Sequence, residues 1–549
     1  MQNPFPIEKL QNLEFGNVDG FKDKELENTF IRTRFINEFL QDKHSIIVGA
    51  MGSGKSALFS LLKNKSDKMG ILKDRTIISI DESIPFSKIK LFASKLEYID
   101  EKQVYQFIWK FHITQKISEK IASFQNFPKN EEEKEINKFL KQVQSTEANE
   151  SIMGKLFGML KGSSFKFKTK VAETPIEIDT LITKKIQIQQ DINLDKILSL
   201  SISTIQKRNM NSILVIIDKI DTFVAGEEYL TQKLYIEALL EIDDDMYVSA
   251  PEIGRKIFLR KDLYKRLSFE SLGYDKVSDN KLNIKWTQTE LIYFLGSRLK
   301  NTLQRENILT QHDLEESNLF GEKRKKRLFN IFLKSNKHIP FLFKKLFFNL
   351  DEMYIERKDV TKKERYMKHI ITKVFPNIVK HRNNKCEEEE IDIFKFFATH
   401  FFNAQNEVSP RNLLIFLKKV NRLAVDYYDE NRDKEAHIVY SKNIPEWKLY
   451  RHDFIYQAYI QSTTAFTKSI ATTQNKWKKY FDIFLRKRGN KNVFDLNWIK
   501  QQTELDEKES IVFCAYLESI GFLYISEGRD EHVKKRKYRL PIMYMPRCK

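Results

Sequence analysis

Short apolar runs separated by longer amphipathic stretches mark the first half of the chain. Runs that are rich in β-branched and aliphatic residues lie at 44–48, 76–81, 212–218 and 255–260. Continuous apolar runs of this length are typical of strands that are buried on both faces of a parallel sheet. Helices are predicted before and after the first run, at 25–40 and 57–62. The pattern therefore predicts an α/β fold in this part of the chain.

A long polar stretch, 87–198, separates the second run from the third. It is predicted to be largely helical, and it contains a charged segment at 129–134 and a glycine-bearing segment at 154–162. Charge-rich helical segments are usually solvated. We interpret 87–198 as a helical insertion between core strands and expect it to lie in solvent.

The pattern becomes helical after 281–286, which we interpret as the exit from the sheet. Thr287 and Glu290 have the spacing of a capping box at a helix start, and Ser409-Pro410 has the pattern of another helix start. We predict a helical lid domain over 286–440. The basic run 323–327 and the acidic run 387–390 are expected to be solvated faces or loops.

The last part of the chain combines helices with a basic hairpin. Helices are predicted at 477–488, 497–502 and 507–520, and strands at 521–525 and 535–540. Helices followed by a two-stranded hairpin are the outline of a winged helix-turn-helix. The predicted organisation is an N-terminal segment, an α/β core with the insertion, the helical lid, and a helical and winged-helix-like end, with bounds at 1–43, 44–285, 286–440 and 441–549.

Composition narrows the class of protein. The chain has 549 residues with only 17 Gly and 12 Pro but 42 Phe, which favours helical packing over a turn-rich β protein. Cys386, Cys514 and Cys548 are its only cysteines and have no paired spacing, so neither a disulfide framework nor a zinc site is predicted. Because no secretion signal and no apolar run of about 18 residues occurs, we expect a cytoplasmic protein without a membrane partner.

Charge alone leaves two interpretations open. The net charge is +19 and the pI is about 9.3. Such a balance fits a polyanionic partner, because Lys and Arg side chains that neutralise phosphates release counterions. A lysine-rich composition from an AT-rich genome would give the same number.

A glycine-rich segment after the first apolar run has the spacing of a phosphate-binding loop. Lys55 can reach the β- and γ-phosphates, and the Ser56 hydroxyl can ligate Mg²⁺. The backbone N–H groups of such a loop and the following helix N-terminus favour a phosphate chain. The alternative is a chance match in a turn. The residues of this glycine-rich loop are Gly49, Ala50, Met51, Gly52, Ser53, Gly54, Lys55, Ser56 and Ala57.

Asp218 ends the aliphatic run 213–217, as expected for the carboxylate that holds Mg²⁺ beside a phosphate loop. The next position usually carries a glutamate that polarises water, but here it is Lys219. Asp221 is our substitute candidate, with Glu227 or Glu228 behind it; its alternative role is to cap a helix or turn. Slow hydrolysis is therefore expected.

Arginines that follow a core strand or begin a lid helix can contact a γ-phosphate. Arg260 is the first candidate and Arg266 the second, while Arg411 could reach the nucleotide from the lid. An ordinary solvated arginine is the alternative for each. Phe15 or Phe30 could stack on adenine, although we favour the interpretation of both as core aromatics.

The hairpin at the end of the chain is basic. Its predicted recognition helix, 507–520, is acidic at its start and apolar afterwards, so base reading is not expected from it. The wing is better suited to phosphates. A module that contacts only protein is the alternative. The candidate DNA contacts are Lys534, Lys535, Arg536, Lys537 and Arg539.

Several of these segments together resemble one protein family. They are Phe15-Gly16, the glycine-rich loop, 217–221, 259–263, Trp286, and Ser409-Pro410-Arg411. The set is similar to that of the STAND and KAP-like P-loop ATPases of bacteria, which are related to AAA+ initiator ATPases of the origin-recognition type. Many of these proteins lie in anti-phage defence loci. The resemblance covers roughly 1–300 and extends only loosely to the rest of the chain.

The resemblance implies an ASCE-type P-loop core, ATP with Mg²⁺ as cofactors, nucleotide-driven switching and self-assembly into a homo-oligomer or hetero-complex. The expected function is a slowly hydrolysing switch ATPase that exposes its C-terminal module to DNA or to an effector protein encoded nearby. Two alternatives are a DNA-binding initiator or regulator and a scaffold with an inactive nucleotide site. The chain shows no nuclease, protease or deaminase constellation, so any destructive chemistry would belong to a partner.

Overall fold

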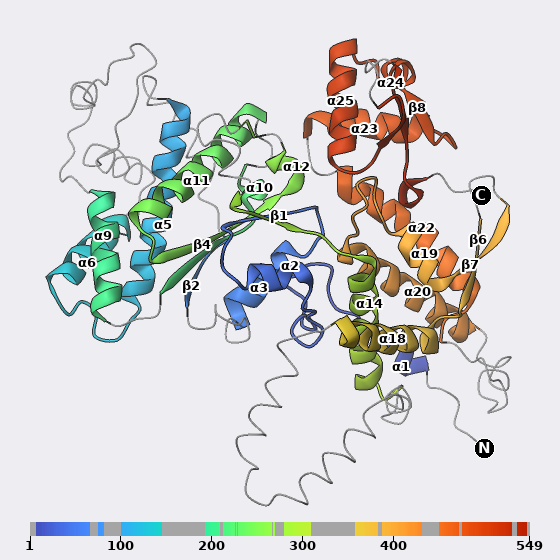
Figure 1. Ribbon diagram of the computed structural model, residues 1–549, viewed down its shortest axis with the longest axis horizontal. Coiled ribbons are helices and arrows are strands. Elements are labelled where there is room, and N and C mark those ends of the chain that lie inside the picture. Colours follow the sequence, from blue (N-terminus) through green and yellow to red (C-terminus); the bar gives the residue numbers. More distant parts are fainter. Residues whose placement is uncertain are drawn as a thin grey trace, which may run out of the picture. The chain divides into compact units, whose positions relative to one another are not determined.

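A computed structural model describes the greater part of the chain, in segments separated by gaps. The described residues are 7–65, 75–81, 100–144, 193–208, 212–224, 227, 229–265, 267–268, 279–308, 357–382, 387–430, 449–471, 475–529 and 535–545. The chain divides into two compact units (Figure 1). The sheet unit comprises Arg34–Met51 and Lys55–Ile284, and the helical unit comprises Met1–Thr33, Gly52–Gly54 and Lys285–Lys549.

A five-stranded sheet forms the centre of the sheet unit. All of its strands are parallel, in the order β2-β3-β4-β1-β5. The four predicted strands are confirmed. The segment after Asn280, interpreted above as the exit from the sheet, is instead a fifth strand that pairs with β1. The strands are β1 Ile46–Gly49, β2 Thr76–Ile80, β3 Ile213–Ile217, β4 Ile253–Arg260 and β5 Lys281–Ile284.

One face of this sheet is covered by long helices. Alternate strand residues such as Val48, Val215 and Ile257 are buried in one apolar cluster with side chains of α5 (Glu101–Ala122) and α11 (Tyr229–Ser249). Figure 1 shows these two helices on the same side of the strands.

The intervening strand residues are buried against the opposite layer. Phe258 of β4 contacts Phe59 of α3 (Lys55–Lys65) edge to face, at 6.0 Å between ring centroids. It also contacts Phe39 of α2 (Arg34–Phe39) at 6.4 Å. Burial of both faces explains why the strands read as unbroken apolar runs.

The helices of the predicted insertion are less solvated than expected. In the described part of 87–198, α5 carries fully buried residues, among them Trp109, whose indole Nε1 donates to the Tyr235 carbonyl at 3.1 Å. In α6 (Glu131–Gln144), Glu133 is buried and pairs with Arg208 at 2.6 Å, directly after α9 (Leu194–Lys207). The prediction of a solvated excursion is therefore wrong for α5 and Glu133. The 154–162 segment lies outside the described residues.

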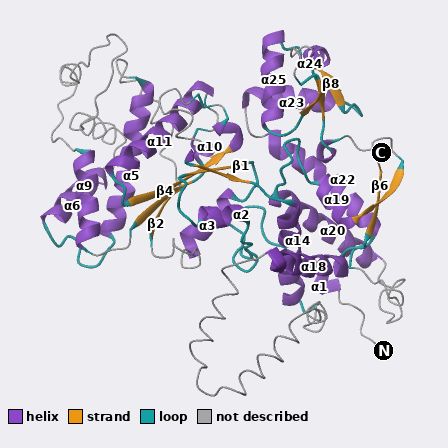
Figure 2. Cartoon of the chain, in the orientation of Figure 1, coloured by secondary structure: helices purple, strands orange, loops and turns teal. Residues whose placement is uncertain are grey.

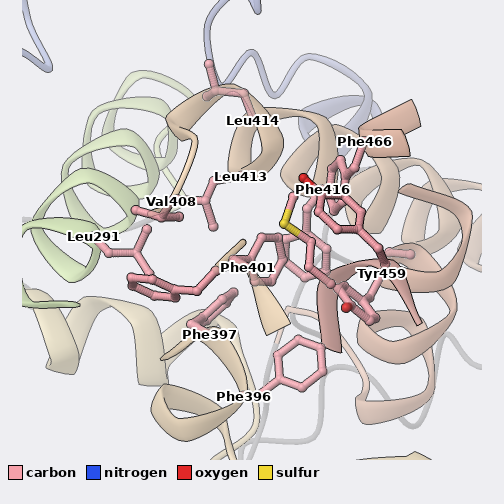
Figure 3. Close-up of a cluster of buried hydrophobic side chains, with 14 of the residues drawn as sticks. Leu291, Phe396, Phe397, Phe401, Val408, Leu413, Leu414, Phe416, Tyr459 and Phe466 are labelled. Atoms are coloured by element: carbon pink, nitrogen blue, oxygen red, sulfur yellow. The ribbon is translucent and has the colours of Figure 1, made fainter. Parts of the chain in front are cut away.

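The helical unit has its own aromatic core. Figure 3 shows Phe397, Phe401 and Phe416 meeting near Tyr459, and the rings of Phe401 and Phe416 are 5.2 Å apart at 74°. Tilted and edge-to-face pairs of this kind suit the ring quadrupole. The helices around this core are α1 Ile7–Gln11, α14 Gln288–Arg305, α18 Arg357–Val374, α19 Ile393–His400, α20 Pro410–Glu430 and α22 His452–Ala471.

The predictions for two segments, 286–440 and 25–40, need correction. The interval 286–440 is not purely helical, because β6 (Ile378–Arg382) and β7 (Glu388–Asp392) form an antiparallel hairpin (Figure 2). Three residues of the acidic run lie on β7 and Glu387 directly precedes it; all four are exposed, as expected for a solvated segment.

The helix predicted at 25–40 is wrong for its first part, which forms turns before α2. Asn28 and Thr29 are poor helix formers.

Phe15 is buried in the core of the helical unit, with 1% of its surface exposed. Its carbonyl oxygen accepts a hydrogen bond from Arg298, which also pairs with Asp23 at 2.6 Å. Thr302 donates to the Glu14 carbonyl at 2.7 Å. The interpretation of Phe15 as a core aromatic is confirmed. Phe30 is partly buried.

The end of the helical unit combines three helices with three short strands. The helices predicted there are confirmed as α23 (Asn475–Lys487), α24 (Leu496–Thr503) and α25 (Glu507–Ser519). The hairpin of β9 (Tyr524–Glu527) and β10 (Lys537–Arg539) is joined by β8 (Val493–Asp495), which we did not predict, in the antiparallel order β8-β10-β9. The predicted domains 286–440 and 441–549 fall into one compact unit.

Within the described residues, no helix combines the length and the apolar character needed to cross a membrane.

Candidate functional site at the carboxyl edge of the sheet

The glycine-rich loop connects β1 to α3. Gly52 and Gly54 adopt φ angles of +76° and +103°, which L side chains rarely adopt, so glycine is required at both positions. Ser56 and Ala57 lie in the first turn of α3, while Ala50 and Met51 are partly buried in the loop. The strand, the turn and the helix that this motif needs are therefore all present.

Lys55 is a buried cation at the start of α3, with 8% of its surface exposed. Its Nζ donates to the carbonyl oxygens of Gly49 at 2.8 Å and Ala50 at 2.9 Å. Burial lowers the pKa of Lys55 to about 8, while the negative charge of Asp218 acts in the opposite direction. The ammonium group is thus held close to a carboxylate inside the sheet unit.

Asp218 directly follows β3 and is 4% exposed. Its carboxylate accepts hydrogen bonds from the Ser56 side chain and the Lys219 backbone, yet burial is the larger effect and raises its pKa. Its Oδ2 is buried without a hydrogen-bond partner among the described residues. A buried carboxylate oxygen with spare acceptor capacity beside a serine hydroxyl is a donor set that fits Mg²⁺. Ser56 and Asp218, the two residues predicted to hold that ion, are therefore in contact.

Arg260 lies at the end of β4, where it is the register partner of Gly49 in β1. Its guanidinium donates to Asp262 through Nε at 3.1 Å and Nη2 at 2.9 Å, and to Asp221 through Nη1 at 3.0 Å. Burial alone would lower the pKa of Arg260, but the two carboxylates outweigh it and raise the pKa. Asp262 lies in the one-turn helix α12 (Lys261–Tyr264) and was not a sequence candidate.

Asp221 lies in the one-turn helix α10 (Ile220–Phe223). Its carboxylate pairs with Arg260, and the role of a water-polarising base stays a prediction. Lys219, immediately before α10, has a left-handed backbone with φ 63°. Glu227 is partly buried. The structure thus brings Lys55, Ser56, Asp218, Asp221 and Arg260 together at one edge of the sheet.

The tip of the glycine-rich loop, Gly52–Gly54, belongs to the helical unit. There, Trp286 Nε1 donates to the Ser53 carbonyl at 2.8 Å, and Ser409 Oγ donates to the Gly52 carbonyl at 3.2 Å. A Cβ atom added at Gly52 would lie 3.1 Å from Cβ of Arg411. Arg411 is therefore near the loop tip, and its predicted contact with a nucleotide stays a prediction.

The candidate nucleic-acid residues lie on or beside β10. Lys535, Lys537 and Arg539 are exposed, and Lys537 pairs with Glu527 of β9 at 2.5 Å. Arg536 is partly buried. The preceding helix α25 carries acidic residues in its first turn, as predicted.

Some candidates lie outside the described residues. They are Glu228, Arg266, the basic run 323–327, Cys386, Cys548 and Lys534.

Comparison with known proteins finds a weak similarity. The chain is 24% identical over 298 residues to the 80.3 kDa protein of transposon gamma-delta from Escherichia coli (strain K12). The alignment covers 52% of this chain and 39% of that protein, so the chain spans well under half of the relative's length. No family model matches the chain, and no solved structure matches it significantly.

Proposed function

We propose that this protein is an ATP-binding, slowly hydrolysing switch ATPase of the STAND and KAP-like kind. Nucleotide would bind with Mg²⁺ at the carboxyl edge of the sheet, and its state would control a C-terminal module that contacts DNA or an effector protein. The strand order, in which β4 lies between β1 and β3, is compatible with the ASCE-type P-loop core that the resemblance implies.

The observation that carries this proposal is the contact between Ser56 and Asp218 beside Lys55. Lys55 and Ser56 are residues of the glycine-rich loop that begin α3, and Asp218 directly follows a strand much further along the chain. A hydroxyl, a carboxylate and an ammonium group in this arrangement can hold Mg²⁺ and a triphosphate together. A glycine-rich turn matched by chance would not be expected to meet this carboxylate.

Slow turnover follows from the residues around Asp218. A general base raises the rate by roughly 100- to 10,000-fold when it is positioned to take a proton from water. Lys219 takes the usual place of such a base, and Asp221 pairs with Arg260. Bound ATP would therefore persist long enough to mark a state of the protein.

Calorimetric titration of the full chain with Mg²⁺·ATP tests the nucleotide site. We expect heat of binding for the wild-type chain, loss of binding in Lys55→Ala, and loss of the Mg²⁺ dependence in Asp218→Asn. Lys63→Ala is the matched control, because Lys63 lies on the same helix but is more exposed and pairs with Asp81 at 3.0 Å. Wild-type protein that gives no heat with adenine nucleotides and Mg²⁺, or Lys55→Ala that binds ATP normally, would refute the site.

The second candidate function is DNA binding by the C-terminal module. It is favoured by the exposed Lys535, Lys537 and Arg539, since cations on a hairpin edge can contact phosphates. The chain order α23, β8, α24, α25, β9 and β10, with the three strands in one sheet, is compatible with a winged helix-turn-helix. If DNA binding is the main function, the chain would be a DNA-binding initiator or regulator. A scaffold with an inactive nucleotide site is the outcome if ATP does not bind.

The biological setting is proposed from resemblance alone. We propose a role in bacterial anti-phage defence, in the cytoplasm, with self-assembly or an effector protein encoded nearby as the partner. The similarity to a protein named for a transposon is equally compatible with a DNA-linked role. Turnover measured with and without DNA separates a C-terminal module that contacts DNA from one that contacts an effector protein, because only the former is expected to respond.

A further inference from the structure

Two carboxylates of unequal exposure hold the guanidinium of Arg260. Asp262 accepts from both Nε and Nη2, and its side chain is 8% exposed. Asp221 accepts only from Nη1, at 3.0 Å, and its side chain is 31% exposed. Paired parallel hydrogen bonds fix a guanidinium more strongly than a single bond does. Asp262 is therefore the firmer partner and Asp221 the one that can be exchanged.

The local charge balance favours such an exchange on arrival of a polyphosphate. Lys55 and Arg260 supply the positive charges, and Asp218, Asp221 and Asp262 supply the negative ones; the other four all act on the ammonium of Lys55. A triphosphate adds further negative charge at the same edge of the sheet. Like charges in a partly buried site repel. The carboxylate of Asp221 is displaced most easily, because it accepts only one hydrogen bond from Arg260 and is more exposed to water than Asp262.

We propose that Asp221 is a placeholder for a phosphoryl group, occupying Nη1 of Arg260 until a nucleotide with a γ-phosphate replaces it. Asp262 keeps the guanidinium in position during the exchange. ADP lacks the replacing group and leaves the Arg260–Asp221 pair intact. Asp221 is then a positioning residue that sets the preference between ATP and ADP, and not the base that takes a proton from water. This inference rests on the proposed nucleotide site.

Affinities of the full chain for Mg²⁺·ATP and Mg²⁺·ADP test the proposal. Asp221→Asn removes the competing charge without changing the size of the side chain, so ATP should bind several-fold to tenfold more tightly while ADP affinity rises far less. Arg260→Gln should weaken ATP binding and leave ADP binding nearly unchanged. In the double variant with Arg260→Gln, the Asp221→Asn change should give no gain in ATP affinity, because the guanidinium that it would free is absent.

Different failures of this experiment point to different errors. If wild-type protein binds neither nucleotide, the proposed function fails and the inference fails with it. If wild-type protein binds ATP but Asp221→Asn leaves the ATP-to-ADP ratio unchanged or shifts both affinities equally, only the inference is overturned. A fall in kcat of about 100-fold or more in Asp221→Asn, at unchanged ATP affinity, would instead identify Asp221 as the base. Should Arg260→Gln fail to fold, the ATP-to-ADP ratio of Asp221→Asn decides the question alone.

Discussion

Lys55 is a buried ammonium group, and its burial makes the stability of the sheet unit depend on pH. The pKa of Lys55 falls from 10.5 to about 8 in the folded chain. Below pH 8 both states are protonated, and the fold bears the full cost of burying the charge. Between pH 8 and 10.5 the unfolded state binds more protons, so the free energy of unfolding rises with pH.

Replacing Lys55 by Met should therefore stabilise the protein at pH 7, and it should abolish the proposed nucleotide binding. The shift corresponds to at most about 3 kcal/mol at pH 7, and the advantage should shrink as the pH rises from 8 to 10.5. Urea unfolding at pH 7 and at pH 10 measures the effect, with Lys63→Met as the control. A Lys55→Met variant that is less stable than wild type at pH 7 would contradict the conclusion that the buried ammonium group destabilises the fold.

The residues of the site differ in how well the sequence predicts them. The glycine-rich loop and Asp218 each carry a local pattern, a turn that needs glycines and an aliphatic run that ends in a carboxylate. Asp262 carries no such signal, because its role depends on a guanidinium two residues away that is also held by Asp221, 39 residues earlier in the chain. A pairing that is created by the fold could not be read from the spacing of these residues.

At the level of elements, caps were predictable because they are local. The capping box of α14 is confirmed: Thr287 accepts from the Glu290 N–H, and Glu290 accepts from the Thr287 N–H at 2.8 Å. Thr287→Ala should lower the free energy of unfolding by about 1 kcal/mol, whereas Thr287→Ser should cost much less because it keeps the hydroxyl. Thermal unfolding of both variants provides the measurement. Equal losses in the two would show that the methyl group matters and the cap does not.

The elements that the sequence missed depend on distant partners. The apolar positions of α5 are interleaved with Lys, Gln and Glu. Its burial could not be predicted from the sequence, because it results from packing against α11 and the sheet. Polar and apolar residues alternate in β5, and β8 has only three residues, so neither forms an unbroken apolar run and each is defined by the strand beside it. By contrast, β1 to β4 were predicted because burial on both faces leaves an unbroken apolar run in the sequence.

At the scale of the whole molecule, the position of the positive charge matters as well as its total. If the hairpin binds DNA, neutralising Lys535, Lys537 and Arg539 together to Gln should weaken binding and flatten its dependence on salt. Each phosphate contact that the substitutions remove should reduce the slope of log affinity against log salt by about 0.9 for duplex DNA. Fluorescence anisotropy with a labelled duplex at several salt concentrations gives this slope.

A matched set of substitutions decides whether DNA binding depends on the position of the positive charges or only on their total. Lys478, Lys479 and Lys487 are exposed on α23 in the same unit, and their replacement by Gln removes the same charge as the hairpin variant. If both triple variants show the same fall in affinity and in slope, the basic composition acts through the whole chain and the hairpin has no special role. A fall confined to the hairpin variant assigns the phosphate contacts to β10. Repeating the titration with Mg²⁺·ATP then tests whether the proposed nucleotide site controls them.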